Sequence, residues 1–207
     1  MTHPVITIGR QFGSGGRMIA ETVAKELGIP CYDRQLIDKT AEESGLGKTY
    51  IKSAEERLTG EPLFGSATFG GIYTPFTPYV IYSNTDKMYF TQSDIIRKLA
   101  EEGPCVIVGR CANFVLKDYA GTFSVFIHAS RKSRVARIIR RYGIEPNDAF
   151  GELAKMDKQR ANYYNYYTDG KWGGVRGYNM ALDSMRLGME STTQVLVDIY
   201  RNQLEVK

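Results

Sequence analysis

Short apolar runs alternate with amphipathic stretches along most of this chain. The apolar runs are continuous, which is typical of strands that are buried on both faces. They predict five strands, at residues 4–9, 29–32, 105–108, 122–128 and 178–182. Helical periodicity between them predicts helices at residues 15–27, 34–44, 48–58, 86–102, 130–142, 146–166 and 191–204. Strands that alternate with helices predict an α/β fold, a three-layer sandwich around a parallel sheet.

Two stretches show neither pattern. Residues 60–85 combine glycine, proline, threonine and aromatic residues, and indicate a long loop or insertion of the kind that is functional or disordered. Residues 168–177 are rich in glycine and charged residues, and predict a second loop.

Composition narrows the class of protein. With 207 residues, of which 43% are hydrophobic, the chain suits one domain with a substantial core. No apolar run approaches the ~20 residues of a membrane span, and the first residues do not form a signal peptide. Three cysteines without metal-binding spacing indicate reduced thiols, so we expect a cytoplasmic protein. The net charge of +4 suits an anionic small ligand and is too small to argue for nucleic acid.

A glycine-rich turn lies between the first predicted strand and the first predicted helix. It has the sequence Gly13-Ser14-Gly15-Gly16. Glycines let main-chain N–H groups converge on a phosphate, and the positive end of the helix dipole points to the same place. We therefore expect the amides from Phe12 to Met18 to surround an anion. The alternative is a turn that only reverses the chain.

This turn departs from the usual phosphate loop, G-x-x-x-x-G-K-[ST]. Arg10 stands where the first glycine belongs, Gly16 where the lysine belongs, and Arg17 where the magnesium-binding hydroxyl belongs. A cation in the first turn of a helix is unfavourable unless an anion is bound there. We therefore expect Arg17 to replace the lysine, against the alternative of a solvated surface arginine.

Magnesium ligands are correspondingly scarce in the sequence. Asp33, at the end of the second predicted strand, is the best remaining carboxylate, because α/β sheets hold ligands at the carboxyl ends of their strands. We expect it to orient the acceptor or a metal-bound water. A plain helix N-cap is the alternative.

Four stretches resemble the cytidylate kinase-like family of phosphate-loop proteins, relatives of the nucleoside monophosphate kinases. They are Ile6–Arg17, Ile29–Asp33, Val106–Ala112 and Lys155–Arg160. The resemblance implies a five-stranded parallel sheet with a monophosphate-binding insertion and a closing lid. It also implies transfer of the γ-phosphoryl group of ATP, with Mg²⁺, to a nucleoside monophosphate.

The family plan divides the chain, which we expect to form a single domain. The core would comprise residues 1–45, 86–130 and 178–207, with the insertion at about 46–85 and the lid at about 131–177. Residues 60–85 are apolar and aromatic enough to pack on a partner subunit, which leaves a homo-oligomer open.

The resemblance gives two basic residues a role at the acceptor. Arg110 directly follows a buried strand and would clamp the acceptor's phosphate, a task that suits the planar guanidinium; a structural ion pair is the alternative. Lys39 would be a second cation for the same phosphate, or else a solvated lysine.

Four residues of the predicted lid also take roles from the resemblance. Asp157 and Arg160 lie three residues apart on one helix face and would hold the acceptor nucleotide, or else pair with each other. Arg134 and Arg137 belong to a basic helix and would reach the donor phosphates; a solvated charged face is the alternative.

Cys111 departs from the family pattern, because typical cytidylate kinases have an aspartate there that helps to recognise cytosine. A thiol cannot make the same hydrogen bonds, so the acceptor base is open. Two rival functions follow: a nucleotide-binding protein without turnover, and a kinase for a non-nucleotide small molecule. A basic RNA-binding protein is a weaker rival.

Overall fold

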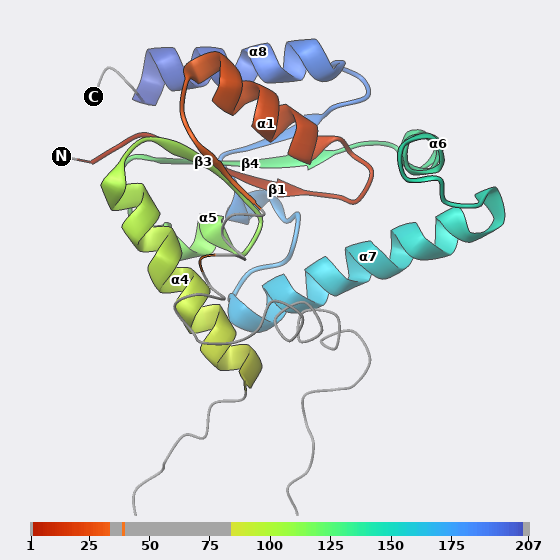
Figure 1. The fold of residues 1–207 in the computed structure, drawn as a ribbon, viewed down its shortest axis with the longest axis horizontal. Helices are drawn as coiled ribbons and strands as arrows, with labels where there is room; N and C mark the ends of the chain where they lie inside the picture. The colour runs from red at the N-terminus through yellow and green to blue at the C-terminus, as the bar shows by residue number, and fades with distance from the viewer. Residues whose placement is uncertain (1, 34–38, 40–83, 205–207) are drawn as a thin grey trace, which may run out of the picture.

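The computed structural model describes residues 2–33, 39 and 84–204 (Figure 1). Its strands form one sheet of five parallel strands in the order β2-β3-β1-β4-β5. The parallel five-stranded sheet expected from the sequence is thereby confirmed. The strands are β1 (Val5–Arg10), β2 (Cys31–Tyr32), β3 (Cys105–Val108), β4 (Thr122–His128) and β5 (Met180–Asp183).

Helices cover both faces of this sheet (Figure 1). α1 (Gly16–Leu27) and α8 (Met189–Ile199) lie over one face, and α4 (Asn84–Glu102) and α5 (Ala112–Val115) lie over the other. The three-layer sandwich is therefore confirmed. No helix of the described residues is long and apolar enough to cross a membrane.

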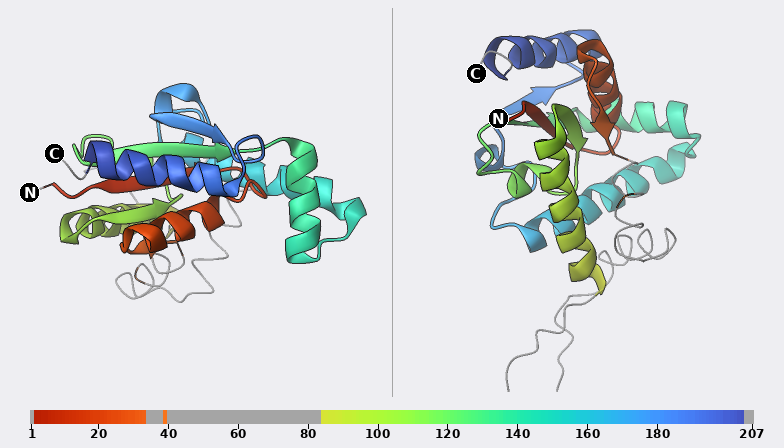
Figure 2. Two further views of the ribbon diagram at one scale, coloured as in Figure 1. Left: turned by 90° about the horizontal axis from the view of Figure 1, so that it is seen from above. Right: turned by 60° about the vertical axis from the view of Figure 1, so that its left-hand side comes forward.

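Two further helices form a hairpin beside the sheet. α6 (Arg131–Tyr142) lies beyond the carboxyl end of β4, and α7 (Pro146–Tyr167) runs back toward α4 and α5 (Figure 2). This hairpin brings α6 and the middle of α7, with Asp157 and Arg160, to the edge where the parallel strands end, the place where α/β sheets hold their ligands.

The helices and turns differ from the prediction in several places. α5 was not predicted, because four residues are too few to show a helical period. The predicted helix at 191–204 begins earlier, at Met189, and continues after Ile199 as a π-helical turn, η2 (Tyr200–Leu204). The predicted loop at 168–177 contains one 3₁₀ turn, η1 (Val175–Gly177). Apart from Lys39, the predicted helices at 34–44 and 48–58 lie outside the described residues, and so does the insertion up to residue 83. Residues 84 and 85, which were expected to belong to the loop, are instead the first two residues of α4.

The core explains why most strand residues are apolar; among the exceptions, Thr7 and Ser124 are buried and hydrogen-bonded to each other at 2.9 Å. Ile6 and Ile8 of β1 pack with α1 and α8, whereas Val5 packs with α4 on the opposite face. Val106 and Ile107 of β3 divide between the two faces in the same way. Because successive side chains of a strand point to opposite faces, a sheet covered on both sides favours apolar residues at successive positions.

Candidate active site

The glycine turn is a tight loop between β1 and α1. Gly13 and Gly15 have φ angles of 73° and 85°, which glycine adopts without strain. A Cβ atom at Gly13 would lie 2.8 Å from Ile138 Cγ2 and 2.9 Å from the main-chain oxygen of Arg134. Both residues belong to α6, so this helix presses on the loop and only glycine fits between them.

The main-chain amides of the loop divide into two sets. The amide of Phe12 donates to Asp157 Oδ1 at 2.7 Å, and the amide of Ser14 donates to the carbonyl of Gln11 at 3.3 Å. Within the described part of the chain, the amides of Gly13 and Gly15 make no hydrogen bond. The expected ring of amides is therefore partly engaged inside the protein.

A pocket of about 220 Å³ remains in front of the loop. Of the residues that line it within the described chain, five are arginines and one, Asp33, is acidic. Such an excess of guanidinium groups beside glycine amides suits a ligand with several negative charges. The arginines are Arg10, Arg17, Arg137, Arg141 and Arg160.

Asp33 lies between two of these arginines. Its Oδ1 atom is 3.6 Å from Arg10 Nη2, and its Oδ2 atom is 3.4 Å from Arg17 Nε. Arg17 also donates from Nε to Glu21 at 2.9 Å, and this hydrogen bond raises the pKa of Arg17. The Arg17 side chain is 54% exposed, against 15% for Arg10, so Arg10 is the more enclosed cation.

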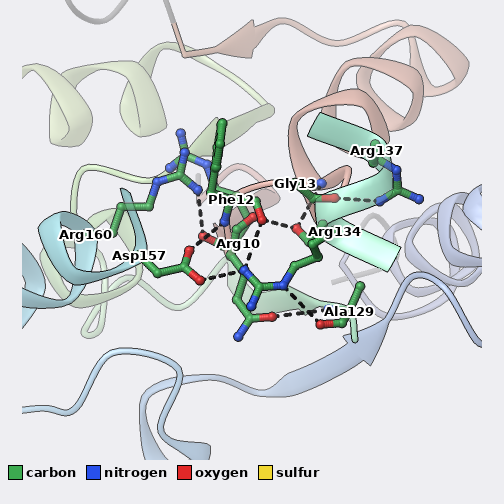
Figure 3. Close-up of polar contacts among 11 residues, drawn as sticks. Arg10, Phe12, Gly13, Ala129, Arg134, Arg137, Asp157 and Arg160 are labelled. Carbon is green, nitrogen blue, oxygen red and sulfur yellow. Dashed lines mark hydrogen bonds and ion pairs between the residues drawn. The ribbon is translucent and has the colours of Figure 1, made fainter. Parts of the chain in front are cut away.

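Helices α6 and α7 are fastened to the loop by side chains (Figure 3). Asp157 of α7 accepts from the Phe12 amide and from Arg134 Nη1, and Arg160 Nη1 donates to the carbonyl of Arg10 at 3.0 Å. Arg137 Nη1 donates to the carbonyl of Gly13 at 2.9 Å. The lid residues chosen from the sequence thus meet on the loop itself.

Arg134 has a different environment from Arg137. It is buried, with Nε donating to the carbonyl of Ala129 and Nη1 donating to the carbonyl of Phe12 and to Asp157. It does not belong to the pocket lining, whereas Arg137 does. Arg134 therefore joins α6, α7 and the loop, and Arg137 faces the anion pocket.

Arg160 is strongly affected by its surroundings. Burial lowers the pKa of Arg160, and the nearby charges of Arg10 and Arg110 lower it further. Its guanidinium carbon also lies 5.6 Å from the centre of the Phe12 ring. A bound anion would relieve the repulsion among these guanidinium groups, because it supplies the missing opposite charge.

The chain after β3 has an unusual backbone. Gly109, Arg110 and Cys111 have φ angles of 75°, 57° and 56°, so three successive residues are left-handed. The Cys111 thiol is buried beside Tyr89 and Tyr164, and burial raises its pKa to about 12. A thiol in that environment stays protonated and does not act as a nucleophile.

Five predicted residues lie outside the lining of this pocket among the described residues: Ser14, Lys39, Arg110, Arg134 and Asp157. Lys39 and Ser14 have other partners. Lys39 has its amine 3.9 Å from Glu102 Oε2 and 5.9 Å from the centre of the Tyr32 ring. Ser14 is buried, and its hydroxyl donates to the carbonyl of Gln11 at 2.8 Å. Neither side chain is directed at the pocket.

Sequence reasoning missed residues that support the loop. Gln11 Oε1 accepts from the Ala129 amide at 3.2 Å, and the Ser184 hydroxyl donates to the carbonyls of Ser14 and His128. These bonds attach the loop to the ends of β4 and β5. No motif marks such residues, because each partner is more than 50 positions away along the chain.

The residues fit a polyphosphate better than they fit a dedicated magnesium site. Arg17 replaces the usual hydroxyl, and Asp33, the carboxylate of the lining, already faces two arginines. No group of three or more histidine, cysteine or acidic residues is placed to hold a metal among the described residues. The described residues are therefore not arranged as a magnesium site held by protein ligands alone.

Known proteins resemble this chain in sequence and in fold. The model of the cytidylate kinase-like family matches residues 5–186. No curated protein matches the chain. The chain is similar to an uncharacterized protein from Eubacterium ventriosum ATCC 27560, with 26% identity, 97% of this chain and 100% of that chain covered, and a TM-score of 0.71.

Two solved kinases share the fold at lower identity. A shikimate kinase from Bacteroides thetaiotaomicron is 13% identical, with 96% of this chain and 98% of that chain covered and a TM-score of 0.52. A gluconokinase from Sinorhizobium meliloti 1021 is 17% identical, with 97% of each chain covered and a TM-score of 0.50. These likenesses concern the arrangement of the chain alone.

Proposed function

This chain belongs to the cytidylate kinase-like family, and we propose that it is an ATP-dependent phosphotransferase whose acceptor is a nucleoside monophosphate. One observation carries the proposal: the pocket in front of the glycine loop, lined by five arginines and one carboxylate among the described residues. Its size and charge suit the phosphates of a donor nucleotide that meets an anionic acceptor.

In the proposed reaction an oxygen of the acceptor's phosphate attacks the γ-phosphorus of ATP. The bond from that phosphorus to the bridging oxygen breaks, and ADP leaves with the electron pair. The attacking oxygen is already ionised, so the step needs no general base. Catalysis then consists of positioning and charge neutralisation, as in other phosphoryl transfers.

The donor phosphates would lie against the amides of Gly13 and Gly15, since the Gly16 amide donates to the Ser14 hydroxyl at 3.4 Å. Arg17 and Arg137 line the same pocket and would neutralise the donor's charge. Asp157 and Arg134 would act by holding the loop and the lid together, since they bond to Phe12 and to each other.

The acceptor phosphate would lie toward the carboxyl ends of β2 and β3. Asp33 and Arg160 line the pocket on this side, and Arg110 is close enough to influence the pKa of Arg160. Lys39 has no place in this proposal, because its amine lies beside Glu102.

A kinase with a non-nucleotide acceptor is the second candidate. Cys111 favours it, because this buried and protonated thiol stands where typical cytidylate kinases have the aspartate that helps to recognise cytosine. The kinase neighbours, a shikimate kinase and a gluconokinase by name, offer hydroxyl acceptors as the class to test.

The deciding experiment incubates the full chain with ATP, in magnesium buffer, and with CMP, dCMP, UMP or AMP. ³¹P NMR follows ADP and the new diphosphate. We expect one monophosphate to give equal amounts of both products. ADP only with hydroxyl acceptors would establish the second candidate, and ATP binding without any ADP would establish a binding protein.

A matched pair of variants connects the activity to the pocket. Arg137→Ala removes a lining arginine and should lower ATP affinity about 10-fold, the usual size for a charge-assisted contact. Arg140→Ala removes an exposed arginine of the same helix that lies outside the lining, and ATP affinity should stay the same.

A further inference from the structure

The side chain of Arg10 leaves no room for a side chain at residue 16, which is glycine. Arg10 is the last residue of β1, and Gly16 is the first residue of α1. A Cβ atom at Gly16 would lie 2.7 Å from Arg10 Cβ and 3.2 Å from Ile127 Cβ. Atoms so close to the main chain cannot swing aside, so residue 16 must be glycine while residue 10 has a side chain.

These two positions are the ones at which the loop departs from the usual pattern. The usual loop has glycine at the position of Arg10 and lysine at the position of Gly16. The two departures therefore compensate sterically. The start of the helix lacks the lysine side chain, and the end of the strand carries the Arg10 side chain instead. The Cβ atom of Arg10 lies too close to leave room for the Cβ atom of a lysine at position 16.

The Arg10 side chain extends toward the acceptor side of the pocket. A Cβ atom at Gly109 would lie 1.9 Å from Arg10 Nη1, so the guanidinium lies directly over this glycine at the end of β3. Arg10 Nη2 is 3.6 Å from Asp33, at the end of β2. The guanidinium thus lies where three parallel strands end, at the boundary between the donor pocket and the acceptor side.

Arg17 is placed less well for the same task. It projects from the first turn of α1, donates to Glu21 of its own helix and is 54% exposed. Arg10 is 15% exposed and lines the pocket. Charged groups act more strongly on a ligand when they are shielded from water.

We propose that Arg10 is the cation that replaces the loop lysine and that it contacts the phosphoryl group in transfer, with Gly16 and Gly109 leaving room for its side chain. This inference rests on the proposed function, since it assigns a residue to the same donor pocket. Asp33 is then a positioning residue, which holds the guanidinium before the nucleotide binds.

A double-mutant cycle tests the exchange of positions. Calorimetry measures the binding of ATP, and of inorganic tripolyphosphate as a probe without a base, to the full chain and to three variants. Arg10→Gly should lower both affinities about 10- to 100-fold. Gly16→Lys should lower them as well, because its Cβ collides with Arg10.

The double variant carries the decisive result. Arg10→Gly with Gly16→Lys restores the usual pattern and removes the collision, so we expect its affinities to return to within about 5-fold of the original. That recovery is a coupling between the two sites, which independent substitutions do not produce. Losses that simply multiply would overturn the proposal, and so would an Arg10→Gly variant with unchanged affinity.

Side-chain variants keep the test decisive if a loop variant fails to fold. Arg10→Gln preserves length and removes charge, and should bind as weakly as Arg10→Gly; Arg10→Lys should keep most of the affinity. Arg17→Ala is the comparison, and a larger loss there than in Arg10→Gln would overturn the proposal. All of these are binding measurements, so absence of acceptor phosphorylation would refute the proposed function without deciding this inference.

Discussion

The dipeptide Gly-Arg occurs at the carboxyl ends of two neighbouring strands, and the backbone takes a different path through each copy. β1 ends in Gly9-Arg10, and β3 is followed by Gly109-Arg110, with Ile8 and Val108 paired side by side. Gly9 and Arg10 remain in the sheet, paired with Phe126 and Ile127 of β4. Gly109, Arg110 and Cys111 instead turn left-handed.

The cause is the neighbour on the far side of each strand. β1 has β4 beside it, which is long enough to keep Arg10 extended. β3 has β2 beside it, and that pairing ends with Tyr32 opposite Ile107. The same Gly-Arg sequence therefore becomes a strand end in one place and a sharp turn in the other, because strand pairing outweighs local preference.

The two arginines are therefore held in position in different ways. Arg10 is held in the sheet and lies over Gly109, so its position is set by regular structure. Arg110 is held by a backbone conformation that costs of order 1 kcal/mol for each residue with a side chain. The left-handed turn after β3 therefore sets the path of the chain at Arg110, the residue proposed to bind the acceptor's phosphate.

Arg110→Ala should have the largest effect. If Arg110 contacts the acceptor's phosphate as proposed, removing its guanidinium should lower kcat/KM for the acceptor by about 10²- to 10³-fold, or about 3–4 kcal/mol. ATP affinity should stay the same, because the donor pocket is intact. Steady-state kinetics together with calorimetry would measure both; a loss of ATP affinity alone would place Arg110 on the donor side.

Asp157→Ala should give the next largest effect, on stability. It leaves the enclosed Arg134 without its carboxylate and the Phe12 amide without its acceptor. We expect about 3 kcal/mol less free energy of unfolding in urea. Glu152→Ala is the matched control, since it removes an exposed ion pair with Lys155 on the same helix. Equal losses in both variants would contradict the importance of the loop contact.

The variants Gly109→Ala and Gly28→Ala distinguish the cost of backbone strain alone from the cost of strain together with a collision with Arg10. Gly109 is left-handed and lies under the Arg10 guanidinium, whereas Gly28 is left-handed with no atom within 4 Å of the place that a Cβ atom would occupy. Gly28→Ala should cost about 1 kcal/mol of stability, the strain alone. Gly109→Ala should cost about 2 kcal/mol and weaken ATP binding as well. If both variants lost the same stability and kept the same ATP affinity, the Arg10 guanidinium would not lie against Gly109.

The ionisation of the three cysteines should have the smallest effect on the protein, a loss of stability at high pH. Burial raises the pKa of Cys31 to about 11, and burial raises the pKa of Cys105 and Cys111 to about 12, from an ordinary value of 9.0. The native thiols keep protons that the unfolded chain releases above about pH 9, so stability should fall as pH rises from there.

Alkylation provides the measurement. At pH 8 iodoacetamide should label the native protein slowly and the urea-unfolded protein quickly, because only the thiolate reacts. Mass spectrometry of peptides identifies the modified cysteines. Rapid native labelling of Cys111 would show that the side of the molecule after β3 is open to water.

The sequence by itself determined the architecture and the loop. Apolar runs predict buried strands because each face of the sheet must be covered, and the glycine turn at 13–16 predicts an anion site because few other residues allow that turn. It also indicated that positions 10 and 16 are exceptional, although it favoured Arg17 as the replacement cation.

Only the tertiary structure decided which arginines share a pocket. Arg134 was expected to face the donor phosphates like Arg137, yet one is buried against Asp157 and the other lines the cavity. Their spacing along α6 does not show which of them is buried. Their environments depend on contacts with the glycine loop and on the contact of α7 with that loop, and each of these contacts joins residues more than 100 positions apart in the sequence. Contacts between distant segments are set by packing, which a local pattern does not encode.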